Sequence, residues 1–328
     1  MLEDYEITRG GSEGKMALAD RKPPSQAEYD AWRQKLSNWG RWGADDELGS
    51  VNFVTPEVRR AAAKLVSAGR SVSLARPIDT HAGPRNPFPA HHMIPVGSSG
   101  GLVDYIGMFI HGFAHTHIDA LSHIPTADGA NFYNGRPRSP ETMLPSGPTS
   151  GVDFWRDGIA TRGVLYDIPR LRGAPYVRPG EPVHAWDLED AAARQGVVPR
   201  SGDAVIIRSG LDPYLREHPT GAGFASPAGV HASVLEFLWQ HEASLLVWDM
   251  LEAPTADQGV ANPLEIPTPV HVHCIAIPYM GLALLDNAQL EPLAAACAEL
   301  GRWEFLLVVA PLVIPGGTGS PVNPIALL

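Results

Sequence analysis

The sequence predicts an α/β fold in which helices pack on a central mixed β-sheet. Apolar runs typical of buried strands alternate with helical patterns through the middle and C-terminal half of the chain. Hydrophobic residues make up 44% of the 328 residues and charged residues 19%, which is enough apolar surface for a sizeable core. No change of composition marks a second domain, so we expect a flexible N-terminal arm over 1–25 and one domain over 26–328.

The first predicted elements are two helices with recognisable starts. Ser25 can cap a helix over 26–39, in which apolar residues recur at helical spacing. Thr55 followed by proline opens a second helix, which Gly69 would end. A strand over 71–78 and a long loop over 79–101, rich in proline, glycine and serine, come next.

The remaining elements alternate between the two types. Apolar runs predict strands, and amphipathic runs between them predict helices. The strands are expected at 103–124, 163–168, 203–210, 244–250 and 305–314, and the helices at 185–196, 233–241 and 290–301.

Charge and cysteine content exclude several classes of protein. Thirty-six acidic residues against 25 basic ones give a net charge of −11. An acidic chain of this kind does not attract nucleic acid or an anionic membrane. Cys274 and Cys297 are too few for a disulfide scaffold or a cysteine-rich zinc module. The N-terminus lacks an apolar signal region, and the longest apolar stretch is too short to span a bilayer. We therefore expect a soluble cytoplasmic protein.

Histidines gather in the apolar segment 103–124. In an extended strand, His115, His117 and Asp119 point to one face, with His111 upstream on the same face. Two imidazoles and a carboxylate suit a divalent metal such as Zn²⁺, Mn²⁺ or Fe²⁺. The simpler alternative is a polar strand face with hydrogen-bonded histidines, but burying such a cluster costs free energy unless something compensates.

Two further stretches could contribute to the same site. His123 could return to it if the chain turns after Asp119. His271 and His273 are again two residues apart, so in a strand they would share a face, and Asp286 follows. Either histidine of this pair could complete a metal shell or carry a proton, and the alternative is a structural histidine at a strand edge.

The segment from Phe113 to His123, F-A-H-T-H-I-D-A-L-S-H, resembles the motif H-x-G-T-H-x-D-x-P-x-H. This motif is the hallmark of the cyclase-like metal-dependent hydrolases, which include bacterial kynurenine formamidases and isatin hydrolases. Phe113, His115 and Leu121 stand where the family has His, Gly and Pro. Supporting similarity at W-G-R-W-G-A-D-D-E-L-G-S-V-N, G-D-A-V-I-I-R-S-G and G-G-T-G-S-P-V-N-P extends the resemblance over about 39–326.

The resemblance implies a ligand set. His117 and Asp119 correspond to metal ligands of the family, and His123 corresponds to a residue that is a ligand or a proton carrier there. Because Phe113 cannot bind a metal, His115 is the expected substitute for the first ligand, with His111 behind it.

The resemblance also covers the downstream pair. His273 and Asp286 resemble the histidine and the acidic residue that two-zinc members use. Asp286 is one methylene shorter than the glutamate expected there. We therefore expect one divalent metal ion, zinc or manganese, although a second ion is possible.

The implied reaction is hydrolysis of an amide or ester bond by metal-activated water. Family members open lactones, cyclic amides or N-formyl amides, so a small cyclic or aromatic substrate is expected, and His123 or His273 would relay the proton. Related proteins assemble, so a homo-oligomer, dimer or tetramer, is expected as well. Candidate pocket aromatics are Trp39, Trp42, Phe113, Phe132 and Tyr133. The alternative is a catalytically silent metal- or ligand-binding protein on the same fold.

Two other motifs do not support their usual functions. The stretch 97–101 matches G-x-S-x-G by letters, but no strand precedes it and no helix follows it, as a serine nucleophile would need. The glycine-rich stretch 316–320 has no lysine after it, so it is not a phosphate-binding loop. We expect it to be a turn that closes over the site.

Overall fold

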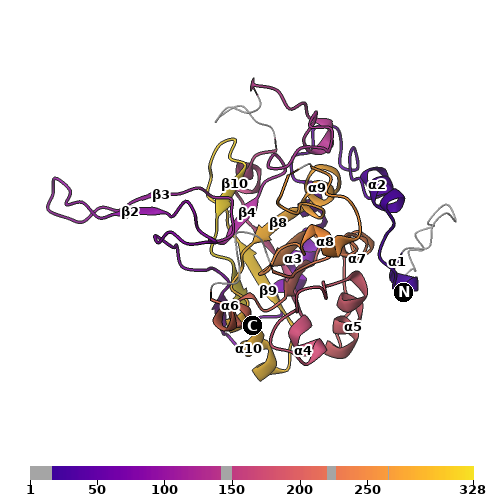
Figure 1. Cartoon of the computed structure of the whole chain (residues 1–328). Coiled ribbons are helices and arrows are strands. Elements are labelled where there is room, and N and C mark those ends of the chain that lie inside the picture. The colour runs from indigo at the N-terminus through magenta and orange to yellow at the C-terminus, as the bar shows by residue number, and fades with distance from the viewer. Residues whose placement is uncertain (1–16, 142–149, 220–226, 265) are drawn as a thin grey trace.

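The computed structural model describes residues 17–141, 150–219, 227–264 and 266–328, and Figure 1 shows the path of the chain. The α/β expectation is confirmed. Within the described residues, nine strands form one mixed sheet with the order β1-β11-β9-β5-β6-β7-β8-β4-β10. The strands are β1 (Ser71–Ser73), β4 (His117–Asp119), β5 (Ile159–Asp167), β6 (Ala204–Arg208), β7 (Leu245–Trp248), β8 (Ala283–Asp286), β9 (Glu304–Val309), β10 (Gly319–Pro321) and β11 (Ile325–Leu327). Most of the arm predicted over 1–25 lies outside the described residues.

The four central strands, β5 to β8, run parallel, and the strands on both sides of them are antiparallel. In β6, Val205 and Ile207 join one apolar core while Ala204 and Ile206 join the other. The sheet is therefore buried on both faces. This explains why the central strands are continuous apolar runs in the sequence.

Helices and short turns connect the strands. The helices are α1 (Ala17–Asp20), α2 (Gln26–Lys35), α3 (Pro56–Ala63), α4 (Ile168–Arg172), α5 (Ala185–Gln195), α6 (Leu211–Glu217), α7 (Val234–Gln240), α8 (Thr255–Gln258), α9 (His273–Ile275) and α10 (Glu291–Leu300). The shorter turns are η1 (Gly49–Phe53), η2 (Tyr133–Gly135), η4 (Val152–Trp155) and the π-turn η5 (Ala276–Met280). No helix in the described part of the chain is long and apolar enough to cross a membrane.

The predicted helix starts are confirmed. Ser25 and Glu28 form a capping box, with the Ser25 hydroxyl 3.3 Å from the Glu28 amide and the Glu28 carboxylate 2.7 Å from the Ser25 amide. The Thr55 hydroxyl accepts a hydrogen bond from the Val58 amide at 3.3 Å. However, α3 ends at Ala63, six residues before Gly69.

Four predicted segments differ from the structure. The strand expected over 305–314 ends at Val309 in β9. Only Ser71–Ser73 of the strand expected over 71–78 is extended in the sheet, and only His117–Asp119 of 103–124 joins it. The loop expected over 79–101 contributes β2 (His91–Met93), which pairs with β3 (Tyr105–Gly107) in a hairpin that projects far from the body of the molecule (Figure 1). The sequence pattern overlooked this hairpin because its apolar residues are exposed rather than buried on one face.

Candidate metal centre

Strand β4 places two of the predicted residues at the centre of the site. His117 and Asp119 point to one face of β4, and the register with β8 sets His117 opposite Asp286. The Nε2 atom of His117 lies 3.4 Å from Asp119 Oδ1 and 3.9 Å from Asp286 Oδ2. His117 Nδ1 donates to the carbonyl of His115 at 2.8 Å, so its Nε2 lone pair is directed toward the two carboxylates.

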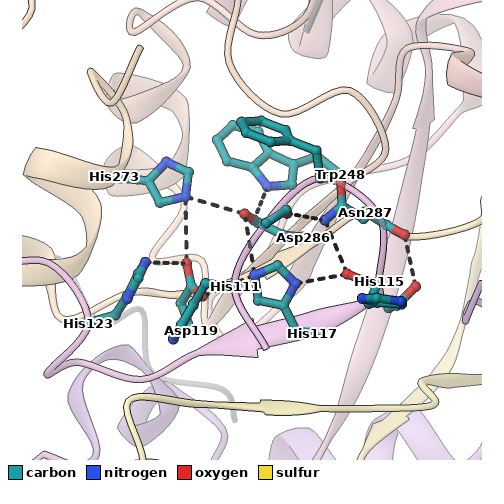
Figure 2. A network of polar contacts seen from close by, with 12 residues as sticks. His111, His115, His117, Asp119, His123, Trp248, His273, Asp286 and Asn287 are labelled. Carbon is teal, nitrogen blue, oxygen red and sulfur yellow. Dashed lines mark hydrogen bonds and ion pairs between the residues drawn. The ribbon is translucent and has the colours of Figure 1, made fainter. Parts of the chain in front are cut away.

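His273 reaches the same point from the start of α9 (Figure 2). Its Nε2 lies 3.5 Å from Asp119 Oδ2 and 3.4 Å from Asp286 Oδ2. Its Nδ1 donates to Glu252 Oε1 at 2.6 Å. The expectation that His271 and His273 share a strand is wrong, because this segment turns into a helix, yet both rings approach Glu252.

His111 and His123 complete the cluster on its other side. His111 Nδ1 lies 2.9 Å from Asp119 Oδ1, and His123 Nε2 lies 3.8 Å from Asp119 Oδ2. The two rings stack with centroids 3.6 Å apart and an angle of 5° between their planes. The turn expected after Asp119 therefore does bring His123 to the cluster.

His115 does not join these side chains. Its Nε2 lies 3.1 Å from the Asp79 amide and 3.2 Å from the Asp79 carbonyl, and Figure 2 shows the ring apart from the cluster. The expected placement of His115 on the metal-binding face fails because β4 begins only at His117, so strand alternation does not extend back to residue 115. His111 occupies the position beside Asp119 instead.

The cluster fits a metal ion. The groups His111–His117–Asp119 and Asp119–His273–Asp286 each offer three ligand atoms that lie within 4.8 Å of one another. Asp119 Oδ2 is buried and accepts no hydrogen bond from any residue that the structure describes. Imidazole nitrogens and carboxylate oxygens are the donors that Zn²⁺ and Mn²⁺ accept.

The buried carboxylates of the cluster also favour a bound cation. Asp119, Glu252 and Asp286 are 1%, 2% and 3% exposed, respectively. Within the described ranges, histidines alone form ion pairs with these three carboxylates, and no lysine or arginine does. Buried carboxylates require a compensating charge, and a divalent cation supplies two.

The histidine pKa values reflect this negative surplus. Burial alone would lower the pKa of His273, but Asp286, Asp119 and Glu252 hold it well above its usual value. Burial would also raise the pKa of Asp119, but His123 and His111 hold it well below its usual range. His123 differs, because burial lowers its pKa to about 3 despite the attraction of Asp119. Burial and the neighbouring histidines thus oppose a positive charge on His123.

A cavity of about 300 Å³ opens beside the cluster. This volume is at the small end of the range for ligand pockets. Its lining residues include His111, His117, His123, His273 and Asp286, together with the apolar side chains of Phe113, Ile124, Leu251, Ile266 and Val270. Of the five aromatic candidates, only Phe113 lines this cavity. Phe132 and Tyr133 are buried.

The glycine-rich stretch 316–320 does lie beside the cluster. The Thr318 hydroxyl is 3.0 Å from His111 Nε2, and Gly319 pairs with Asp119 across β10 and β4. A Cβ atom on Gly319 would come within 2.7 Å of the His111 ring, so glycine is needed for this close approach.

Sequence reasoning missed two residues behind the ligands. Glu252 holds His273, and Trp248 donates from Nε1 to Asp286 Oδ1 at 2.5 Å. Both lie at or just after the end of β7, where polar residues follow a buried parallel strand. That position was the one signal that could have indicated them.

Comparisons with known proteins identify related sequences and structures. A family model described as a putative cyclase matches residues 44–253. A solved structure described as a novel cyclase is 31% identical, with a TM-score of 0.75, and the match covers 90% of this chain and 99% of that one.

Two isatin hydrolases are similar in fold. One, bound to the product analogue thioisatinate, is 17% identical with a TM-score of 0.53, and the match covers 83% of this chain and 97% of that one. Another, from Labrenzia aggregata and bound to benzyl benzoate, is 18% identical with a TM-score of 0.51, covering 82% and 98%. No curated protein matches the sequence.

Proposed function

The chain belongs to the cyclase family, and from this premise we propose that it is a metal-dependent hydrolase acting on an amide or ester bond of a small cyclic or aromatic substrate. The observation that carries the proposal is the convergence of His117, Asp119 and His273 on one buried point, beside a cavity of about 300 Å³. The isatin hydrolases, which share the fold, support the same class of reaction.

We propose that His117, Asp119 and His111 hold a divalent ion, zinc or manganese, with His111 in place of His115. Asp119 also belongs to the second group, with His273 and Asp286, which could hold a second ion. A bound ion would supply Lewis acidity and an activated water. Metal analysis would count one ion per chain if the two groups act as one site, and two ions if they act separately.

The side chains around the ion have separate roles in this proposal. His123 lines the cavity with its Nε2 3.8 Å from Asp119 Oδ2, so it is placed to carry a proton between the attacking water and the leaving group. His273 keeps one ring orientation because Glu252 accepts its Nδ1 proton. The apolar cavity wall keeps bulk water from the reacting bond.

The test is an Asp119→Ala variant. Because Asp119 is the residue common to both groups, its removal should abolish both metal binding and hydrolysis of lactones, cyclic amides or N-formyl amides. Metal content and a hydrolysis screen measure these two effects, and circular dichroism checks that the fold persists. The exposed Asp104 on the hairpin provides the control variant, Asp104→Ala, which should keep both properties.

The outcomes separate the alternatives. Activity that persists in Asp119→Ala would contradict the assigned site. A wild-type protein that holds metal but cleaves none of these substrates would be a silent metal-binding protein. A wild-type protein without metal, unaffected by chelators, would contradict both.

A further inference from the structure

Arg85 is a partly buried cation without an anionic partner among the described residues. Its Nη2 donates to the Phe113 carbonyl at 3.1 Å, and its Cζ lies 5.8 Å from the centre of the Phe113 ring. Its Nη1 is buried and has no hydrogen-bond partner in the described part of the chain, where no carboxylate forms an ion pair with Arg85. The guanidinium therefore has unused donors.

Three other arginines in the described part of the chain, each with a largely buried side chain, are paired with carboxylates. Arg76 contacts Asp212 at 2.5 Å, Arg162 contacts Asp203 at 2.7 Å, and Arg208 contacts Asp167 at 2.6 Å. An unpaired buried charge costs folding free energy. In a chain with an excess of acidic residues, the lack of a partner at Arg85 is a feature of this position rather than a shortage of carboxylates.

Arg85 lines a cavity that adjoins the metal centre. This second cavity has a volume of about 320 Å³, and its walls include Arg85, Phe88 and Phe109. It shares His111, Gly112 and Phe113 with the cavity of about 300 Å³ beside the cluster. Because the two cavities share these residues, the guanidinium and the metal-ligand cluster face adjoining spaces.

We propose that Arg85 binds a carboxylate group of the substrate, so that the substrate class is a small hydrolysable compound with a carboxylate remote from the bond that is cleaved. The guanidinium would form a charge-assisted, forked pair with this group, and the aromatic walls would contact the rest of the molecule. The assignment to a substrate rests on the proposed hydrolase function, but binding of a carboxylate at Arg85 does not.

The test compares benzoate with benzamide, which has the same shape and no charge. Isothermal titration on the purified wild-type protein should show benzoate binding at least about tenfold more tightly, as expected for hydrogen bonds to a charged group. Arg85→Gln should abolish the preference, and Arg85→Lys should keep part of it. Arg59→Gln, an exposed arginine on α3, is the matched control and should leave the preference unchanged.

The same titration on Asp119→Ala separates the two proposals. Arg85 is not a metal ligand, so the benzoate preference should survive there even though hydrolysis is lost. Equal benzoate affinity in the wild type and Arg85→Gln would overturn the proposal. So would a preference that disappears only in Asp119→Ala, because the carboxylate would then bind at the metal centre.

Discussion

At the scale of single residues, two site histidines are oriented by hydrogen bonds from the ring nitrogen that points away from the carboxylates. His117 donates from Nδ1 to a backbone carbonyl, and His273 donates from Nδ1 to Glu252. Each ring therefore presents Nε2 to the buried carboxylates. Partners of this kind fix the tautomer and raise the basicity of a metal-binding imidazole. Glu252 provides the charged partner of the two.

Glu252→Gln tests this role. The amide oxygen can still accept the Nδ1 proton of His273, but the negative charge that supports a cation is lost. We expect metal affinity to fall by roughly 10- to 100-fold, the usual effect of removing such a partner. Competition with a metal-binding dye would measure the affinity, and this readout does not depend on knowing the substrate.

Glu57→Gln is the control for this variant, because Glu57 is an exposed glutamate on α3. It should bind metal as the wild type does. An unchanged metal affinity in Glu252→Gln would contradict this prediction. It would show that the negative charge of Glu252 is not needed for metal binding.

At the scale of elements, the sequence predicts those parts of the fold that have a local cause. The cap at Ser25 and the apolar runs of β5 to β7 depend on neighbours in sequence or on burial of both faces, and these elements appear as expected. Strand alternation failed for His115, because the length of β4 is set by its pairing with β8 and β10 rather than by its own residues. Composition does not encode such pairing limits.

The junction between η5 and β8 requires a glycine because of contacts with segments that are distant in sequence. Gly281 ends η5 with φ +63°, and a Cβ atom there would lie 2.4 Å from the Tyr133 ring. Its carbonyl accepts a hydrogen bond from the Ser50 amide at 2.7 Å. The turn thus packs η1 and η2 against the start of the strand that carries Asp286.

We predict that Gly281→Ala lowers the free energy of unfolding by about 2–5 kcal/mol, combining the cost of a left-handed alanine with that of overpacking. Gly301 is a matched control, since its φ is also +63° but nothing lies within 4 Å of a Cβ there. Gly301→Ala should cost only the conformational part, about 1–2 kcal/mol. Urea unfolding of both variants gives the comparison, and equal losses would show that Tyr133 moves aside without cost.

At the scale of the whole molecule, the site combines segments that lie far apart in sequence. The histidines at 111–123, Glu252 after β7, and His273 with Asp286 meet only because β4, β7 and β8 are neighbours at one side of the sheet. Motif resemblance identified His117, Asp119, His123 and the downstream pair as candidates. It could not indicate Glu252, whose role depends entirely on the position of α9 beside β7.

The hairpin of β2 and β3 is the other feature at this scale. It extends away from the body of the molecule (Figure 1), and its apolar residues each expose half or more of their surface. These residues are Met93, Ile94, Val96, Leu102, Val103, Tyr105 and Ile106. Exposed apolar residues gathered on one projecting element are typical of a surface that another chain covers. We propose that a second copy of the chain covers it, which would give the expected homo-oligomer.

Replacing Leu102 and Ile106 together by lysine should disrupt such an assembly. Two lysines on the apolar surface would have to lose their hydration in the interface, and that cost opposes association. Light scattering during gel filtration should give a dimer or larger species for the wild type and a shift toward the monomer for the double variant. The control pair, Val66→Lys with Val198→Lys, changes exposed valines outside the hairpin and should leave the mass unchanged. Because the hairpin lies outside the main sheet, the monomeric variant should also retain its metal. A wild-type protein that is itself a monomer would contradict the proposed assembly through the hairpin.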